Sequence, residues 1–143
     1  MKKLLALVVL ATIAGLAYAQ ASVSNLPIQL IASGAYTQAS VVSTDRSNPS
    51  WRGVQVTINI SAYTSGTYTP HIEGKDPVSG AYYDILVGSA LNGTGTTLLS
   101  VYPGITATGN VSASNVLPAT WRVEMVGAST PSATFSVGGF LQQ

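Results

Sequence analysis

The chain has 143 residues and no cysteine, and only 8% of its residues are charged, against about 25% in an ordinary soluble domain. One domain is expected at this length, and the absence of cysteine excludes disulfides, thiolate metal sites and a cysteine nucleophile. The formal net charge is +1, so the chain lacks the strongly basic surface that nucleic-acid binding requires. This composition favours a binding or structural module that needs no cofactor.

The first 19 residues have the three parts of a secretory signal peptide. Two lysines precede an apolar run over residues 4–16, and Ala17-Tyr18-Ala19 places small residues for cleavage before Gln20. A cut after Ala21 is the alternative. The apolar run is shorter than the roughly 20 residues that span a bilayer. We therefore expect export to the periplasm or the medium, with no membrane contact after cleavage.

Residues 20–25 are expected to form a polar N-terminal arm, and residues 26–143 are expected to form one domain. Short apolar runs separated by Gly, Pro, Asn and Asp are typical of strands and turns. The expected strands cover residues 26–32, 36–42, 53–61, 68–73, 81–87, 96–102, 120–126 and 133–140. This spacing predicts an all-β fold, a single antiparallel β-sandwich of about eight strands, jelly-roll or immunoglobulin-like, with the strand order open.

The alternation within two of these segments predicts which side chains are buried. In residues 53–61 four β-branched residues alternate with Gln55, Thr57 and Asn59, which indicates a strand with one buried and one solvated face. In the segment 120–126, the apolar Trp121 and Val123 alternate with the charged Arg122 and Glu124. Trp121 is therefore expected to anchor the core.

Three aromatic residues are candidate contact residues. Tyr82 and Tyr83 are consecutive in an expected strand, so their rings should lie on opposite faces and one ring should lie outside the core. Trp51 borders a polar loop over residues 43–51. Exposed rings of this kind can stack on sugars or pack against a partner protein.

The first expected strand is a candidate assembly strand. Leu26, Ile28 and Leu30 lie in it directly after the N-terminal arm. An unpaired edge strand can add to the sheet of another subunit. We therefore expect the chain to associate with itself or with a virion or cell-surface protein.

The only histidine, His71, lies near Glu73 and Asp76. His71 and Glu73 are two residues apart and share one strand face, but a metal site needs further ligands, and Lys75 competes for the carboxylates. The pattern is more typical of an outward face with cross-strand ion pairs. No Gly-x-Ser-x-Gly elbow is present, so we expect no catalytic, cofactor or metal site and no enzymatic activity.

Several stretches resemble small proteins encoded by tailed bacteriophages and prophages. The resemblance lies in Gly53-Val54-Gln55-Val56-Thr57-Ile58-Asn59-Ile60, in residues 68–74, in Asp76-Pro77-Val78-Ser79-Gly80-Ala81-Tyr82-Tyr83-Asp84-Ile85-Leu86, and in residues 117–123 and 130–138. It is a strand–turn–strand pattern over roughly residues 26–141, and it contains no catalytic motif. The resemblance implies a compact β-sandwich with a structural or accessory role in a virion, in the manner of a decoration protein.

Two functions are consistent with these features. The first is a non-enzymatic phage structural protein that acts through subunit contacts, which the resemblance favours. The second is an exported bacterial surface module, an adhesin-like subunit or a glycan-binding sandwich, which the signal peptide favours, because a capsid protein assembles in the cytoplasm.

Overall fold

The structure is a computed structural model that describes residues 25–143. The predicted signal peptide over residues 1–19 and most of the predicted N-terminal arm lie outside the described residues. The described part contains no helix and eight strands. These are β1 (Leu26–Tyr36), β2 (Ser40–Val42), β3 (Arg46–Ser47), β4 (Gly53–Lys75), β5 (Tyr82–Val87), β6 (Gly95–Val101), β7 (Ser112–Ala113) and β8 (Thr120–Gln142).

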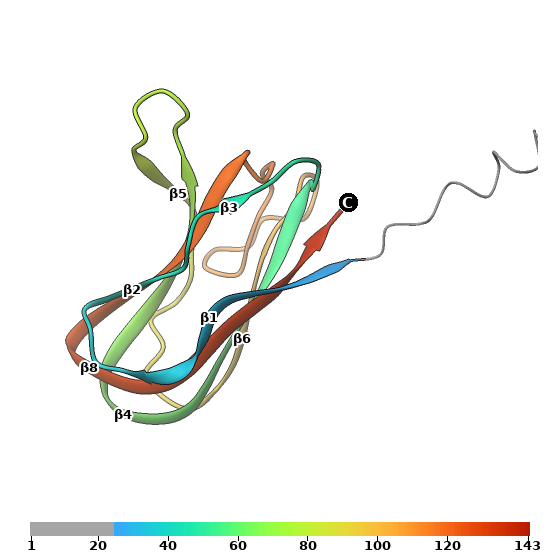
Figure 1. Cartoon of the computed structure of the whole chain (residues 1–143). Coiled ribbons are helices and arrows are strands. Elements are labelled where there is room, and N and C mark those ends of the chain that lie inside the picture. Colours follow the sequence, from blue (N-terminus) through green and yellow to red (C-terminus); the bar gives the residue numbers. More distant parts are fainter. Residues whose placement is uncertain (1–24) are drawn as a thin grey trace, which may run out of the picture.

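All eight strands belong to one open sheet (Figure 1). The main path runs β1-β8-β4-β6-β7, while β2 and β3 pair with β8 and β5 pairs with β4. The β6–β7 pair is parallel and the other pairs are antiparallel. The expected all-β fold is confirmed, but the expectation of a purely antiparallel sheet is wrong. The connection over residues 102–111 carries the chain back along β6, so β7 runs in the same direction as β6.

Two long strands organise the sheet, and each was expected to be two separate strands. β4 and β8 contain 23 residues each and pair along nearly their whole length. Both bend midway, where the pairing shifts register three times between Ile60 and Thr67. Figure 1 shows the bends side by side at one end of the molecule. Thr64-Ser65-Gly66-Thr67, which has the composition of a turn, therefore bends a continuous strand.

The bend depends on backbone conformations that ordinary strands avoid. Gly66 has φ +71°, and Ser129 and Thr130 opposite it have φ +57° and +51°. A Cβ at Gly66 would lie 2.6 Å from the carbonyl oxygen of Ala128. Only glycine combines the left-handed conformation with this close approach.

The bend divides the sheet into two halves. Half I contains residues 53–60 of β4 and 133–142 of β8, with β1, β6 and β7. Half II contains residues 67–75 of β4 and 120–128 of β8, with β2, β3 and β5.

Side chains from both halves share one core. The Phe135 ring in half I lies 5.0 Å from the Tyr68 ring in half II and 4.5 Å from the Tyr36 ring at the end of β1. Trp121 is fully buried, as expected for a core anchor. The alternation predicted for residues 53–61 is also confirmed, because its four β-branched residues are all buried: Val54, Val56, Ile58 and Ile60.

Candidate functional site

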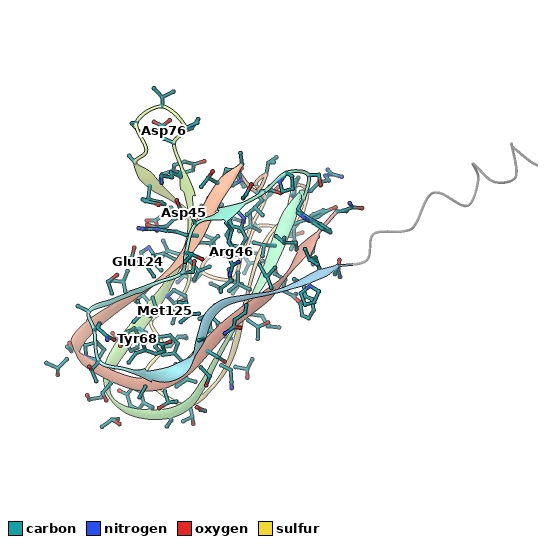
Figure 2. All side chains as sticks on the ribbon, viewed as in Figure 1. Asp45, Arg46, Tyr68, Asp76, Glu124 and Met125 are labelled. Carbon is teal, nitrogen blue, oxygen red and sulfur yellow. The ribbon has the colours of Figure 1, made fainter. Side chains whose placement is uncertain are left out.

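Acidic and basic side chains gather on the outward face of half II. This charged face consists of Asp45, His71, Glu73, Lys75, Asp84, Arg122 and Glu124. It carries four of the five acidic residues of the chain, and the fifth, Asp76, lies in the adjoining β4–β5 turn. Figure 2 shows Asp76 in this hairpin, with Asp45 and Glu124 on the same side of the molecule.

The charges of this face pair with one another. Arg122 donates from Nε to Glu73 at 2.6 Å and from Nη2 to Glu124 at 3.1 Å. His71 Nδ1 lies 2.8 Å from Asp84 Oδ1. The expected cross-strand ion pairs are confirmed, and they satisfy the carboxylates that a metal ion would otherwise need.

Tyr82 links the charged face to the loop before β3. Its hydroxyl donates to Asp45 Oδ1 at 2.7 Å, and its ring lies 3.5 Å from the Arg122 guanidinium carbon. Lys75 Nζ reaches Asp45 Oδ2 at 2.9 Å. The Tyr82 hydrogen bond, followed by the Lys75 hydrogen bond, lowers the pKa of Asp45 below its ordinary value. The Tyr82 ring is therefore committed to this network, and its Arg122-facing side is not free to stack on a sugar.

Removal of Arg122 should destabilise the protein more than removal of Lys75. Arg122→Ala leaves Glu73 without its charged partner and uncovers the Tyr82 ring, and we expect a loss of about 2 kcal/mol in the free energy of unfolding. Lys75→Ala breaks a more exposed pair and should cost clearly less. Urea denaturation of both variants measures the two losses in the free energy of unfolding. Equal losses would show that the Arg122 ion pairs stabilise the fold no more than an exposed ion pair does.

Two carboxyl groups make stability depend on acid pH. Hydrogen bonds from Ser79 and the Val78 amide lower the pKa of Asp76, as Tyr82 and Lys75 lower that of Asp45. A lowered folded-state pKa contributes stability above the unfolded-state pKa, near 3.8, which is lost as the pH falls through the folded-state pKa. We expect the double variant Asp45→Asn/Asp76→Asn to lose less free energy of unfolding than the parent as the pH falls from about 5 to about 2. Identical acid slopes in urea titrations would refute this assignment.

The other two candidate contact residues differ in exposure. Tyr83 is 47% exposed, and its ring covers Gly74 on the face opposite the Tyr82 ring, which confirms the predicted opposition. Trp51 is half-buried and packs against the core. The Asn48 side chain accepts from the Trp51 amide at 2.8 Å and donates to its carbonyl at 2.9 Å. Of the three, Tyr83 presents the most accessible ring.

The candidate assembly strand β1 lies at the end of the sheet path, as an edge strand should. Its Leu26 is exposed and Ile28 is half-buried, but Leu30 is only 6% exposed and belongs to the core. Leu30 is therefore not available for contact with another subunit, because exposing it would disrupt the core.

The free edge of β1 is also a poor template for strand addition. Pro27 lacks an amide hydrogen, and register shifts interrupt β1 on both sides of Ile31. Arg46 donates to the Gln29 carbonyl, and the Tyr36 hydroxyl donates to the Ala32 carbonyl. Proline, bulges and covered carbonyls are devices that keep an edge from pairing with another chain.

The β4–β5 hairpin projects from the end of half II (Figure 1). Five hydrogen bonds hold its turn: Asp76 N to Ala81 O, Gly80 N to Asp76 O, Val78 N to Asp76 Oδ1, Ser79 Oγ to Asp76 Oδ2, and Ala81 N to Ser79 Oγ. Val78 at its tip is 94% exposed. Pro77 and Gly80 are typical of a turn, but nothing in the sequence indicates that Val78 between them is almost fully exposed.

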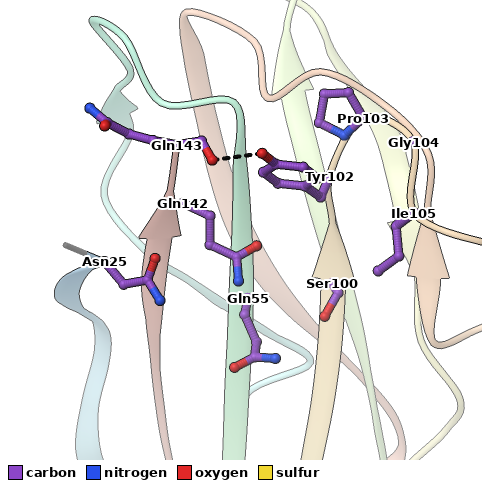
Figure 3. A pocket seen from close by; sticks show the side chains of 9 residues that line it. All are labelled: Asn25, Gln55, Ser100, Tyr102, Pro103, Gly104, Ile105, Gln142 and Gln143. Carbon is purple, nitrogen blue, oxygen red and sulfur yellow. Dashed lines mark hydrogen bonds between the residues drawn. The ribbon is translucent and has the colours of Figure 1, made fainter. Parts of the chain in front are cut away.

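A hollow of about 520 Å³ opens on the outward face of half I (Figure 3). None of its lining side chains is charged, and the lining consists of Asn25, Gln55, Ser100, Tyr102, Pro103, Gly104, Ile105, Gln142 and Gln143. Sequence reasoning missed this hollow, because its lining comes from three strands and a turn that pairing brings together. Only the outward position of Gln55 was predicted.

Within residues 25–143, no group of three or more His, Asp and Glu side chains is placed to hold a metal ion. No helix among these residues is long and apolar enough to cross a membrane. Comparison with known protein families, curated proteins and solved structures found no match to this chain.

Proposed function

We propose that the protein is a non-enzymatic structural subunit of a tailed-bacteriophage particle, of decoration or accessory type, which binds a neighbouring protein subunit. The proposal rests on the resemblance of residues 26–141 to small phage proteins and on the form of the β4–β5 hairpin. Residues 76–86, one of the stretches that carry the resemblance, form the turn of this hairpin and most of β5.

The exposure of Val78 on a fixed turn is the observation that carries the proposal. An apolar side chain at 94% exposure gains nothing for the fold, whereas it contributes to binding when a partner buries it. The five hydrogen bonds of the turn order the backbone in advance, which lowers the entropy cost of association. We therefore assign the hairpin tip as an anchor that enters an apolar pocket of the neighbouring subunit, with Tyr83 at the hairpin base as a second contact.

The low charge of the domain supports a role in subunit contacts. The charged face pairs its own carboxylates, and the Asp76 carboxylate in the hairpin turn accepts hydrogen bonds from the Val78 amide and the Ser79 hydroxyl. A contact through the hairpin tip therefore need not bury a carboxylate that lacks hydrogen bonds. We propose that the bent sheet acts as a β-sandwich whose two layers are halves I and II, supported by the ring contacts of Phe135 across the core.

We also propose that the chain is exported and that the signal peptide is removed before the protein reaches its particle. Association after export resolves the conflict between a signal peptide and a capsid role, because the protein then joins a finished particle from outside. Binding to a finished particle also suits a decoration protein better than a shell-forming one.

An add-back assay tests the proposal. Phage particles that lack this gene are purified, mixed with purified protein, and sedimented through a density gradient. We expect the protein to move with the particles at a saturable ratio. Protein that stays at the top of the gradient at all concentrations would reject the structural role.

A further inference from the structure

We infer that the hollow on half I is a binding site for a neutral carbohydrate. The hollow lies on the opposite half of the sheet from the charged face, and its residues differ from the aromatic candidates Trp51, Tyr82 and Tyr83. A site here is a further activity, independent of the proposed hairpin contact.

The chemistry of the lining selects the class of ligand. Gln55 and Gln142 each offer an amide that is both donor and acceptor, and Ser100 adds a hydroxyl. Adjacent sugar hydroxyls also donate and accept, so they match such groups without any charge. No lining side chain can form an ion pair with a phosphate, a sulfated sugar or a uronic acid. The charged side chain next to the lining is Arg52, whose guanidinium carbon lies 5.5 Å from the Tyr102 ring centroid.

The polar groups of the lining are available to a ligand. The side chains of Gln55, Ser100 and Gln142 are half-buried, yet none of them bonds another described residue. At the other end of β6, by contrast, Thr96 donates to Asn59 at 3.2 Å. The polar atoms of the three lining side chains are open to solvent, since the buried side-chain polar atoms without a partner among the described residues are Arg46 Nε and Trp121 Nε1. A bound sugar therefore replaces water at these groups.

An aromatic ring borders these groups and is held in place. The Tyr102 hydroxyl donates to the Gln143 carbonyl at 2.6 Å (Figure 3). Gly53 provides room for the ring, because a Cβ there would lie 2.6 Å from it. The Arg52 guanidinium carbon lies farther from the centroid of this ring than the Arg122 guanidinium carbon lies from that of the Tyr82 ring. The ring edge together with Pro103 and Ile105 offers apolar surface on which the C–H face of a sugar packs.

The turn that carries the ring is ordered by its own hydrogen bonds. Gly104 N donates to Ser114 Oγ at 3.0 Å, and Ile105 N donates to the Tyr102 carbonyl at 3.2 Å. Gly104 has φ +85°, which favours glycine. The site is thus formed before the ligand arrives, and its volume of about 520 Å³ falls in the range of small-molecule sites.

Heteronuclear NMR of the purified protein tests the inference through the side-chain amide signals of Gln55 and Gln142. The probes are soluble neutral oligosaccharides of glucose, galactose, mannose and N-acetylglucosamine. Oligogalacturonate tests for binding of an anionic sugar, and a Gly/Ser peptide tests for binding of a peptide main chain. We expect at least one neutral oligosaccharide to shift both amide signals.

Matched variants locate the site. Gln55→Ala/Gln142→Ala should weaken binding at least about tenfold, whereas Gln29→Ala, the same change on an exposed glutamine of β1 outside the hollow, should change it less than about twofold. Thermal melts check that all variants fold alike. Absence of any shift at about 10 mM neutral oligosaccharide, equal binding by the double variant, or equal or tighter binding of oligogalacturonate or the peptide would each overturn the inference.

Discussion

Replacement of Val78 by lysine should lower binding to phage particles at least about tenfold. Burial of a valine side chain contributes about 1.5–3 kcal/mol, and about 1.4 kcal/mol corresponds to a tenfold change in affinity. The lysine loses this contribution and also brings an unpaired charge into an apolar pocket. The add-back assay, run as a titration, measures the change in affinity.

The fold should not respond to the same change, because Val78 contacts almost nothing in the free protein. A surface substitution of this kind alters stability by less than about 0.5 kcal/mol. Val111→Lys is the matched control, since Val111 is also an exposed valine and lies on the connection before β7. Equal particle binding by Val78→Lys and the parent would remove the hairpin tip from the contact, and equal loss in both variants would show a general effect of charge.

Replacement of Phe135 by alanine should cost about 3–5 kcal/mol in the free energy of unfolding. The ring is fully buried and touches Tyr36 and Tyr68, so its removal opens a cavity between the two halves of the sheet. The total free energy of unfolding of a native protein is about 5–15 kcal/mol. The variant should therefore lie near the limit of stable folding, and urea denaturation followed by tyrosine and tryptophan fluorescence measures the loss.

Phe140 is the matched control, because it is the only other phenylalanine and lies on the same strand, β8. Its ring is 43% exposed on the outward face of half I, so Phe140→Ala should cost about 1 kcal/mol or less. Similar losses for the two variants would contradict a core shared between halves I and II.

The local features of the fold could be predicted from the sequence. Period-two alternation identified the buried face of residues 53–60, and Trp121 was identified as a core residue by its alternation with Arg122. These predictions succeed because alternation follows from strand geometry alone.

The continuity of β4 and β8 could not be predicted in the same way. Thr64-Ser65-Gly66-Thr67 has the composition of a turn. Pairing with residues 128–132 of β8, more than 60 positions away, keeps the chain within the strand there. Short strands such as β3 were missed for the same reason, since Arg46 and Ser47 pair with Trp121 and Thr120 without any apolar pattern of their own.

The candidate sites show the same division between local and distant determinants. The Asp76-Pro77-Val78-Ser79-Gly80 turn was evident from its residues, but the exposure of Val78 depends on how far the hairpin projects from half II. Likewise Gln55, Ser100 and Gln142 are distant in sequence, and only strand pairing brings them to one hollow.

Mass spectrometry of native phage particles tests the central claim most directly. Particles and cell-free supernatant are separated on a density gradient, and peptides of this protein are measured in both fractions, including the peptide that carries the mature N-terminus. We predict the protein in the particle fraction at a fixed ratio to the major capsid protein, with an N-terminus at Gln20 or Ser22. Detection only as free protein in the supernatant would contradict a virion role.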